Sequence, residues 1–270
     1  MGKGPEHLLK EGAQVRLEKR NHEVVSTTLE LEAPFRQEIG ATFELARLLA
    51  ARVRKAVGEK RLPFVLAGNC ASALGTLAGL AAERLGVVWF DAHGEFNTPD
   101  TTRTGFLDGM PLTMATGRSW KTLCESIPGF RPVLDEQVIL VGARALDPAE
   151  RDLLARSGVR RVSPEEIRKR GVREALAPHL DALATRAHEV YLHLDLDVLD
   201  PGEARVSEYA EPGGLAVAEV EEACLLVAGR FGLRAVAIAS YDPDWDEGGK
   251  GAGAALRLME SLAGVLQTSR

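Results

Sequence analysis

The 270-residue sequence predicts an α/β fold in which helices cover a mainly parallel sheet. From about residue 42 onward, apolar runs of strand length alternate with longer segments of helical period, as in strand–helix–strand units. Polar residues gather directly after these apolar runs, and open parallel sheets bind ligands at the carboxyl ends of their strands. The chemistry of this protein is therefore expected at that edge of the sheet.

Hydrophobic periodicity places the individual elements along the chain. An early segment, 24–33 (VVSTTLELEA), alternates like a strand. Short continuous apolar runs then predict buried strands at about 63–67, 86–91, 137–142, 188–196 and 233–240. Apolar residues at helical spacing predict helices over 41–59, 71–84, 148–157, 164–184, 217–230 and 250–267. No Ser/Gly-rich linker, charge block or internal repeat divides the sequence, so residues 1–270 are expected to form a single domain.

Composition argues against several classes of protein. A net charge of −6 with scattered basic residues is unlike a surface that binds nucleic acid. The three cysteines are widely spaced and odd in number, which is typical of a reducing compartment. No apolar segment approaches the roughly 18 residues of a membrane span, and the N-terminus lacks the apolar region of a signal peptide. We expect a cytoplasmic protein with neither nucleic acid nor membrane as a partner.

Two acidic clusters stand at the ends of predicted strands. In DAHGEFN, Asp91, His93 and Glu95 alternate, so an extended backbone would point all three side chains to one side. In YLHLDLDVLDP, Asp195 and Asp197 have the same spacing at the end of another buried strand. Four carboxylates and a histidine in an apolar setting would repel one another strongly unless cations lie among them. The clusters therefore predict a pair of divalent metal ions, and their oxygen-rich donors favour Mn²⁺ or a similar hard ion.

Each cluster also has a structural interpretation. Two aspartates at alternate positions of a strand end are more often a helix cap or loop hydrogen-bonding groups than metal ligands. A lone His93 is more often a polar residue with an ordinary hydrogen-bond partner. Asp200 precedes a proline, so its carboxylate is expected to hold the turn. The metal interpretation depends on both clusters standing at the same edge of the predicted sheet.

Four segments together resemble the ureohydrolase superfamily, which includes arginases, agmatinases and formimidoylglutamases. In the family order they are LAGNCASALG, WFDAHGEFNTPDTTRTGFLDGMPL, HLDLDVLDP followed by EPGGL, and SYDPDWD. The resemblance implies a three-layer α/β/α, arginase-like fold and two Mn²⁺ ions bridged by a hydroxide. It also implies a trimer or hexamer, and a reaction in which the hydroxide attacks the guanidinium or amidine carbon of a small-molecule substrate.

One strand of the family fold is expected to be missing. Family members begin with a strand and a glycine-rich loop, and only then reach a segment that resembles GKGPEHLL, with which this sequence starts. If the missing strand were an interior one, its neighbours would lose ladder hydrogen bonds and the fold would lose stability.

The resemblance also implies a set of metal ligands, which in this sequence are Cys70, Asp91, His93, Glu95, Asp195 and Asp197. Two of them depart from the family pattern, which has a histidine in place of Cys70 and an aspartate in place of Glu95. A cysteine thiolate favours softer metals than manganese, so Zn²⁺, Fe²⁺ and Co²⁺ become candidates at one position. A buried free cysteine is also common as a small hydrophobic residue, which leaves a purely structural role for Cys70 open.

The catalytic positions depart further from the family. The histidine that shuttles protons corresponds to Asp108, which could do acid–base work only if its pKa were raised. The glutamate that pairs with the guanidinium corresponds to Ser240, so a charge-assisted contact is lost. Asp242 and Glu208 are the candidates to replace that carboxylate.

The residues that hold an amino-acid head group in arginases are better retained. The matching residues here are Asn97, Thr104 and Asp147, which implies a substrate with free α-amino and α-carboxyl groups. Asn97 and Thr104 could instead satisfy loop backbone groups. For Asp147, capping the helix that begins at Pro148 is the simpler interpretation.

These observations favour a metal-dependent hydrolase that acts on a linear C–N bond of an arginine-like guanidino or amidino compound, because every predicted metal position keeps a donor atom. The alternative is a catalytically inactive member of the same fold with a binding or assembly role, suggested by the altered residues Cys70, Glu95, Asp108 and Ser240. A nucleotide-binding domain has little support, since AGNCASALG lacks the glycine spacing of phosphate-binding loops.

Overall fold

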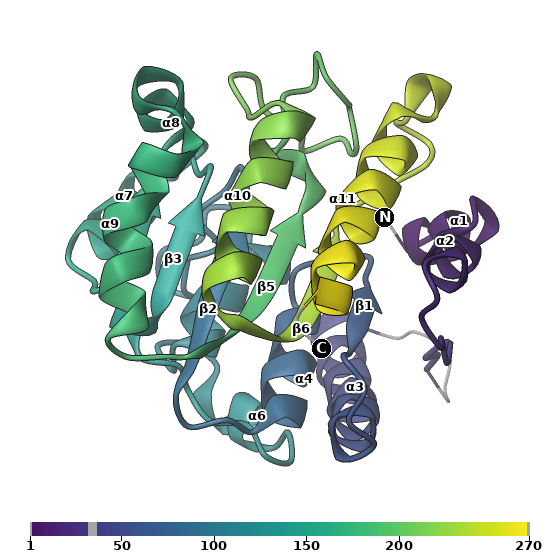
Figure 1. Ribbon diagram of the computed structural model, residues 1–270. Helices are drawn as coiled ribbons and strands as arrows, with labels where there is room; N and C mark the ends of the chain where they lie inside the picture. Colours follow the sequence, from purple (N-terminus) through teal and green to yellow (C-terminus); the bar gives the residue numbers. More distant parts are fainter. Residues whose placement is uncertain (1, 32–36, 269–270) are drawn as a thin grey trace.

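In the computed structural model, which describes residues 2–31 and 37–268, helices pack on both faces of a six-stranded sheet (Figure 1). The strand order is β1-β6-β5-β2-β3-β4, and every neighbouring pair is parallel. The predicted parallel α/β fold is therefore confirmed. The strands are β1 Phe64–Leu66, β2 Leu85–Phe90, β3 Val138–Val141, β4 Arg160–Val162, β5 Glu189–Asp195 and β6 Gly232–Ala239.

The two central strands, β2 and β5, set the position of the acidic clusters. Both strands are buried along almost their whole length because helices cover both faces of the sheet. Their register pairs Phe90 with Leu194. The residues that follow, Asp91 and Asp195, consequently lie side by side at the carboxyl edge of the sheet.

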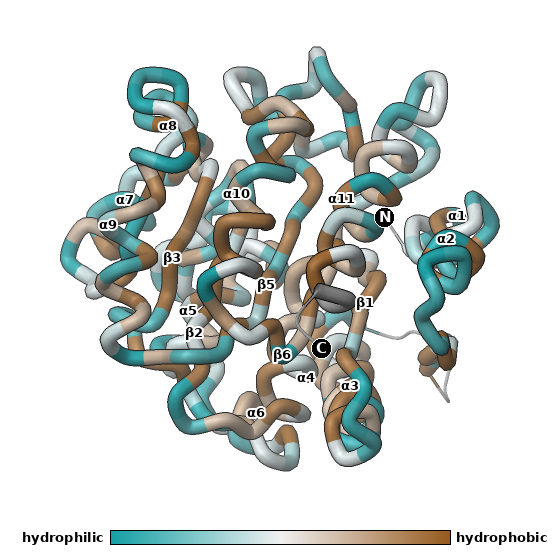
Figure 2. Tube along the Cα trace, viewed as in Figure 1, coloured by the Kyte–Doolittle hydropathy of each residue, from teal (hydrophilic) through white to brown (hydrophobic). Residues whose placement is uncertain are grey.

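Each face of the sheet has its own hydrophobic core. Along β2, Val88 and Phe90 belong to one core, and Val87 and Trp89 belong to the other. Figure 1 shows α9, α10 and α11 in front of the sheet, and Figure 2 shows mostly apolar strands beneath helices with polar outer surfaces. The first core is covered by α1 Gly4–Lys10, α2 Ala13–Lys19, α8 Pro164–Arg170, α9 Val172–Ala184, α10 Val217–Arg230 and α11 Lys250–Thr268; the second by α3 Glu38–Gly58, α4 Ser72–Leu80, α5 Pro111–Ala115, α6 Lys121–Glu125 and α7 Pro148–Ala155.

The packing of α4 on α3 fixes the loop that carries Cys70. Glycines on α4 allow a close approach of the two helices: a Cβ at Gly75 would lie 2.6 Å from the carbonyl oxygen of Ala46, and one at Gly79 would lie 2.5 Å from Cβ of Val53. Larger residues at these positions would push α4 away from α3. Because Cys70 directly precedes α4, this packing also positions its sulfur.

The structure corrects two of the predicted elements. The helix expected over 164–184 is divided into α8 and α9 at Gly171, whose φ of +81° interrupts the helical backbone. The strand expected over 24–33 is wrong for residues 24–31, which form no ladder with any described strand; residues 32 and 33 lie outside the described residues. Val25 is 65% exposed, so this alternation has no core to face.

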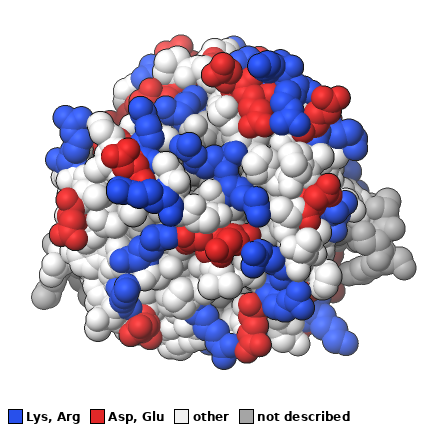
Figure 3. Space-filling model, turned by 90° about the vertical axis from the view of Figure 1, so that its left-hand side faces the viewer, with Lys and Arg blue, Asp and Glu red and all other residues white. Residues whose placement is uncertain are grey.

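Several short elements were not predicted. The strand β4 has only three residues, two of them arginines, and the helices α1, α2, α5 and α6 are five to seven residues long. Elements of this length carry too few apolar repeats for periodicity to identify them. No helix in the described part of the chain is long and apolar enough to cross a membrane. Acidic and basic side chains are interspersed over the face shown in Figure 3.

Candidate metal centre

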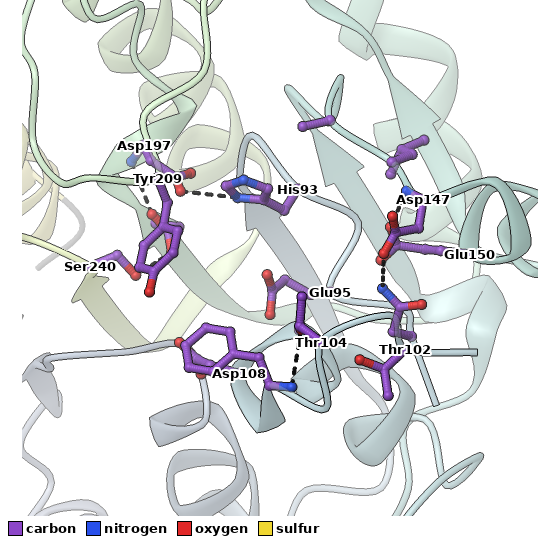
Figure 4. A pocket seen from close by; sticks show the side chains of 16 residues that line it. His93, Glu95, Thr102, Thr104, Asp108, Asp147, Glu150, Asp197, Tyr209 and Ser240 are labelled. Atoms are coloured by element: carbon purple, nitrogen blue, oxygen red, sulfur yellow. Dashed lines mark hydrogen bonds and ion pairs between the residues drawn. The ribbon is translucent and has the colours of Figure 1, made fainter. Parts of the chain in front are cut away.

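The carboxyl ends of β2 and β5 form the floor of a cavity of ≈ 460 Å³ (Figure 4). The loop between β1 and α4 reaches the same place and carries Cys70. The cavity is lined by His93, Glu95, Asn97, Thr102, Thr104, Phe106, Asp108, Gly109, Ala145, Leu146, Asp147, Glu150, Asp195, Asp197, Tyr209 and Ser240.

One group of potential metal donors consists of Cys70, Asp91 and Asp195, and we call it the cysteine cluster. All three residues are buried, and one donor atom of each lies within 4.8 Å of the others. The sulfur of Cys70 lies 2.9 Å from Oδ2 of Asp195 and 3.7 Å from Oδ2 of Asp91. The predicted juxtaposition of three distant segments of sequence is present in the structure.

A second group, Asp91, His93 and Glu95, adjoins the first and is called the histidine cluster. Its donor atoms also lie within 4.8 Å of one another. Nδ1 of His93 lies 3.1 Å from Oδ2 of Asp197 and 3.4 Å from Oδ1 of Asp91. Since Asp91 belongs to both clusters, two cation positions could share its carboxylate.

The expectation that DAHGEFN places its three donors by strand alternation is wrong at its last member. The strand β2 ends at Phe90, and Glu95 has a left-handed backbone with a φ of +52°. The turn is held by the carbonyl oxygen of Glu95, which accepts hydrogen bonds from the backbone N–H groups of Leu112 (2.9 Å) and Thr113 (3.3 Å). A turned loop, and not an extended strand, therefore brings this carboxyl group to the cluster.

The charges of the two clusters fit divalent cations. Burial raises the pKa of Asp91 and raises that of Glu95 well above its usual range, and repulsion from neighbouring carboxylates adds to both shifts. Burial followed by the charge of Asp197 raises the pKa of Asp195 to about 8. Oε2 of Glu95 is buried and has no hydrogen-bond partner among the described residues. A bound cation would compensate these carboxylates and occupy the unpartnered oxygen, so the donor set fits a metal pair.

His93 lies in the negative electrostatic field of the neighbouring carboxylates Asp91 and Asp197. Burial alone would lower its pKa, but hydrogen bonds and charge attraction from Asp197 and Asp91 raise it to about 12. An imidazolium there fills the role of a counter-ion, and a metal ion could replace its proton.

Asp108 does more than line the cavity. Its Oδ1 accepts a hydrogen bond from the backbone N–H of Ala71 (2.9 Å) and its Oδ2 accepts one from that of Cys70 (3.3 Å). Burial raises the pKa of this carboxyl group well above its usual range. Asp108 therefore holds the Cys70 loop, and it meets the condition of a raised pKa set for acid–base work.

Ser240 lies at the cavity wall, but its hydroxyl group is engaged. It donates a short hydrogen bond to Oδ2 of Asp195, and its backbone has a φ of +61°. The two carboxylates suggested as replacements for the family glutamate, Asp242 and Glu208, are not among the described residues that line the cavity. Oδ1 of Asp242 instead accepts a hydrogen bond from the backbone N–H of Asp244.

The expected head-group residues Asn97, Thr104 and Asp147 line the cavity, and Asp147 lies across it from Asp197 and Ser240 (Figure 4). Nδ2 of Asn97 donates to Oδ2 of Asp147 at 3.2 Å. Asp147 occupies the N-cap position of α7, as expected, in a capping box in which Oε2 of Glu150 accepts a hydrogen bond from the backbone N–H of Asp147. The carboxylate of Asp147 also faces Asn97. Oγ1 of Thr104 accepts a hydrogen bond from the backbone N–H of Phe106, which is a loop-stabilising contact.

Asp200 has the structural role expected for it. Its Oδ1 accepts a hydrogen bond from the backbone N–H of Gly202 (2.8 Å), and its Oδ2 accepts from those of Gly213 (2.8 Å) and Gly214 (3.0 Å). The carboxylate thus joins two ends of the loop that follows β5.

His193 lies beside Cys70 but was not among the predicted site residues. Nε2 of His193 lies 3.0 Å from the sulfur of Cys70, and Nδ1 lies 2.6 Å from the hydroxyl group of Tyr191. Burial lowers the pKa of His193 to about 3, so the ring is neutral. The signal was its position on β5 two residues before Asp195, which places both on one face of the strand.

The fold and the site together define a class of protein. Two adjoining donor clusters at the carboxyl edge of a parallel α/β sheet, open to a cavity with polar walls, are typical of an enzyme that uses a pair of divalent metal ions.

Comparison with known proteins identifies the family. A model of the arginase family matches residues 2–264. The chain is 36% identical to the arginase of Bacillus caldovelox over 231 residues, which are 84% of this chain and 77% of that protein. Its fold is similar to the crystal structure of arginase from Bacillus cereus, with a TM-score of 0.90 and 31% identity over 97% of this chain and 92% of the other. The chain belongs to the arginase family of metal-dependent ureohydrolases.

Proposed function

We propose that this protein hydrolyses a linear C–N bond of an arginine-like guanidino or amidino compound in the cavity above the two clusters. The observation that carries the proposal is the pair of donor clusters, which share Asp91 and open into one cavity. The relatives named above are arginases, and their similarity over most of the chain supports the same class of reaction.

The proposed metal ligands are those expected from the sequence: Cys70, Asp91, His93, Glu95, Asp195 and Asp197. Two divalent ions held there would supply a hydroxide nucleophile near neutral pH by lowering the pKa of water. The histidine cluster, with two carboxylates and an imidazole, suits Mn²⁺, whereas the sulfur of the cysteine cluster suits Zn²⁺, Fe²⁺ or Co²⁺.

The protein's own residues would bind and orient the substrate. We assign Asn97 and Asp147 to the head group of the substrate because they form a hydrogen-bonded pair in the cavity wall, with Thr104 nearby on the same loop system. Asp108, whose pKa burial raises well above its usual range, is the candidate to deliver a proton to the departing amine.

One observation favours the alternative of a catalytically inactive protein with the same fold. Ser240 stands where a carboxylate would face the guanidinium, and neither Asp242 nor Glu208 is among the described residues that line the cavity. A protein that binds metal without turning over guanidino compounds would fit this loss.

Metal analysis and an activity screen together test the proposal. The protein, purified without chelator and reconstituted in turn with Mn²⁺, Zn²⁺, Fe²⁺ and Co²⁺, should hold up to two ions per chain by elemental analysis. It should then release urea or ammonia from at least one member of a panel of guanidino and amidino acids. Metal binding without any turnover would favour the inactive alternative, and less than about half an ion per chain would refute both the ligands and the reaction.

Two further expectations stay predictions. The trimer or hexamer implied by the resemblance can be tested by light scattering of the purified protein. The cytoplasmic location can be tested by fractionation of the cells that produce it.

A further inference from the structure

We propose that His193 is a positioning residue for Cys70: it holds the sulfur as a metal ligand and thereby tunes the cysteine cluster toward ions that prefer sulfur. This inference rests on the proposed function, because it presupposes that the clusters bind metal. His193 itself is not a member of either donor cluster.

The geometry places the imidazole directly beside the sulfur. Nε2 of His193 lies 3.0 Å from Sγ of Cys70, which is well within the range of an N–H···S hydrogen bond. Both residues are fully buried, so water does not compete for the contact. On the same sulfur, Oδ2 of Asp195 lies 2.9 Å away and marks the direction of the cluster.

The neighbours of His193 allow the hydrogen of its ring to lie on Nε2. The hydroxyl group of Tyr191 lies 2.6 Å from Nδ1. When this hydroxyl donates to Nδ1, the single hydrogen of the neutral ring is on Nε2 and points at the sulfur. Tyr191, His193 and Asp195 alternate on β5, so one strand face supplies the donor to the ring, the ring itself and a cluster carboxylate.

The ring also has a fixed orientation. It stacks on the indole of Trp89 with centroids 3.8 Å apart and an interplanar angle of 25°. Nε1 of the same indole donates to Oδ2 of Asp91 at 2.9 Å. Trp89 therefore couples the position of His193 to that of a second member of the cysteine cluster.

Charge explains why such a donor is useful here. The cysteine cluster already contains two carboxylates, and a thiolate would add a third negative charge in a buried place. A hydrogen bond from a neutral imidazole stabilises the thiolate without bringing a cation that would repel the metal. Because this contact uses none of the carboxylate oxygens of the cluster, it can persist when an ion is bound.

The alternative is that Cys70, His193 and Tyr191 form a nucleophilic triad. Such a triad needs a sulfur that the substrate can reach. Cys70 is 1% exposed and does not belong to the described lining of the cavity. The arrangement thus suits a ligand held from behind better than a nucleophile.

Cobalt titration of the metal-free protein tests the inference. A cysteine ligand gives Co²⁺ a sulfur-to-metal charge-transfer band, and we expect this band in the unaltered protein and its loss in Cys70→Ser. His193→Phe keeps an aromatic ring against Trp89 but removes both hydrogen bonds. We expect it to weaken Co²⁺ and Zn²⁺ binding about 10- to 100-fold and to weaken the band, with a much smaller effect on Mn²⁺.

Three further variants guard against a general loss of structure. His193→Gln retains an N–H donor near the position of Nε2 and should restore part of the Co²⁺ affinity. Tyr191→Phe leaves the ring in place and removes only the donor to Nδ1, so the band should shift or weaken less than in His193→Phe. Cys224→Ser removes another buried thiol, in α10, and should leave the band unchanged.

The outcomes separate this inference from the proposed function. If the unaltered protein binds none of these ions, the proposed function fails as well. If it binds Co²⁺ through sulfur and neither the band nor the Co²⁺ affinity changes in His193→Phe, only the role of His193 is overturned. Where His193→Phe does not fold, an unchanged band and affinity in Tyr191→Phe overturn that role instead.

Discussion

The two ends of the cavity are built in different ways. One end carries the cysteine and histidine clusters, and we call it the metal end after the proposed function. It is formed where β2 and β5 stop, and its carboxylates Asp91 and Asp195 are almost completely buried. The mouth is formed by loops, and its aromatic side chains Phe106 and Tyr209 are 38% and 40% exposed, with ring centroids 5.8 Å apart. A rigid scaffold thus fixes the two donor clusters, while the mouth depends on loops, which tolerate change.

The largest effect is expected at the metal end, from Asp195→Ala. This change removes a carboxylate of the cysteine cluster and the hydrogen-bond acceptor for both Cys70 and Ser240. The metal content should fall below half that of the unaltered protein, with loss of turnover, as measured by elemental analysis and urea release. Asp181→Ala, on the exposed side of α9 in an ion pair with Arg230, is the matched control and should change neither. Unchanged metal stoichiometry in Asp195→Ala would refute the assigned site.

The predictability of the metal end follows from local geometry. The common edge of the parallel strands was enough to place Asp91 beside Asp195, whereas Asp197 lies in a 3-10 helix (Leu196–Val198) and not on an extended strand. His193 was not predicted as a site residue, because its partner Cys70 is 123 residues away in sequence and no local pattern indicates that contact. The position of Glu95 was expected for the wrong reason, since its left-handed backbone cannot be read from alternation.

Metal removal should have the next largest effect, and it should act on stability as well as activity. Ions that bind the folded chain but not the unfolded chain stabilise it, by about 2.7 kcal/mol at a hundredfold excess over the dissociation constant. Chelation should therefore lower the melting temperature in calorimetry, because the buried carboxylates lose their counter-charge. Readdition of Mn²⁺ or Zn²⁺ should restore it. A melting temperature indifferent to chelator in metal-loaded protein would argue that the ions bind elsewhere, at weak surface sites.

At the mouth, Asn97→Ala should change substrate affinity and leave the metal alone. It removes the partner of Asp147 and one polar group of the cavity wall. For a guanidino substrate with an α-carboxyl group, kcat/KM should fall about tenfold, or ~1.4 kcal/mol, mainly through KM. A guanidino compound without that carboxyl group serves as the control and should be affected less. Loss of metal in Asn97→Ala would contradict the separation of the two ends.

The mouth shows what could not be predicted. Asp147 was expected at the N-cap of α7 and lies there, but the hydrogen bond that its carboxylate accepts from Asn97 was not expected from capping. That contact depends on the path of a loop fifty residues earlier. Similarly, Asp108 holds the backbone of Cys70, a contact between loops that no periodic pattern encodes. Strand and helix positions repeat along the chain and can be predicted from it; the contacts between loops do not repeat.

The smallest effect is expected from Asp200→Asn, which alters the loop between the two ends. Hydrogen bonds from the backbone N–H groups of Gly202, Gly213 and Gly214 lower the pKa of this carboxyl group below its usual range. A carboxyl group with a lowered pKa in the folded state contributes stability above its unfolded pKa of about 3.9, and this contribution is lost as the pH falls through the folded pKa.

Asp200→Asn should therefore reduce the free energy of unfolding by about 1 kcal/mol at pH 7, and the difference from the unaltered protein should narrow below about pH 4. Urea denaturation at several pH values measures both. The loop also depends on the close packing of Gly214 against the backbone of Asp200, because a Cβ at Gly214 would lie 2.5 Å from the backbone nitrogen of Asp200. Gly214→Ala should therefore lower the free energy of unfolding at every pH. If the loss of unfolding free energy in Asp200→Asn is also independent of pH, the shape of the Asp200 side chain, and not its charge, explains its role.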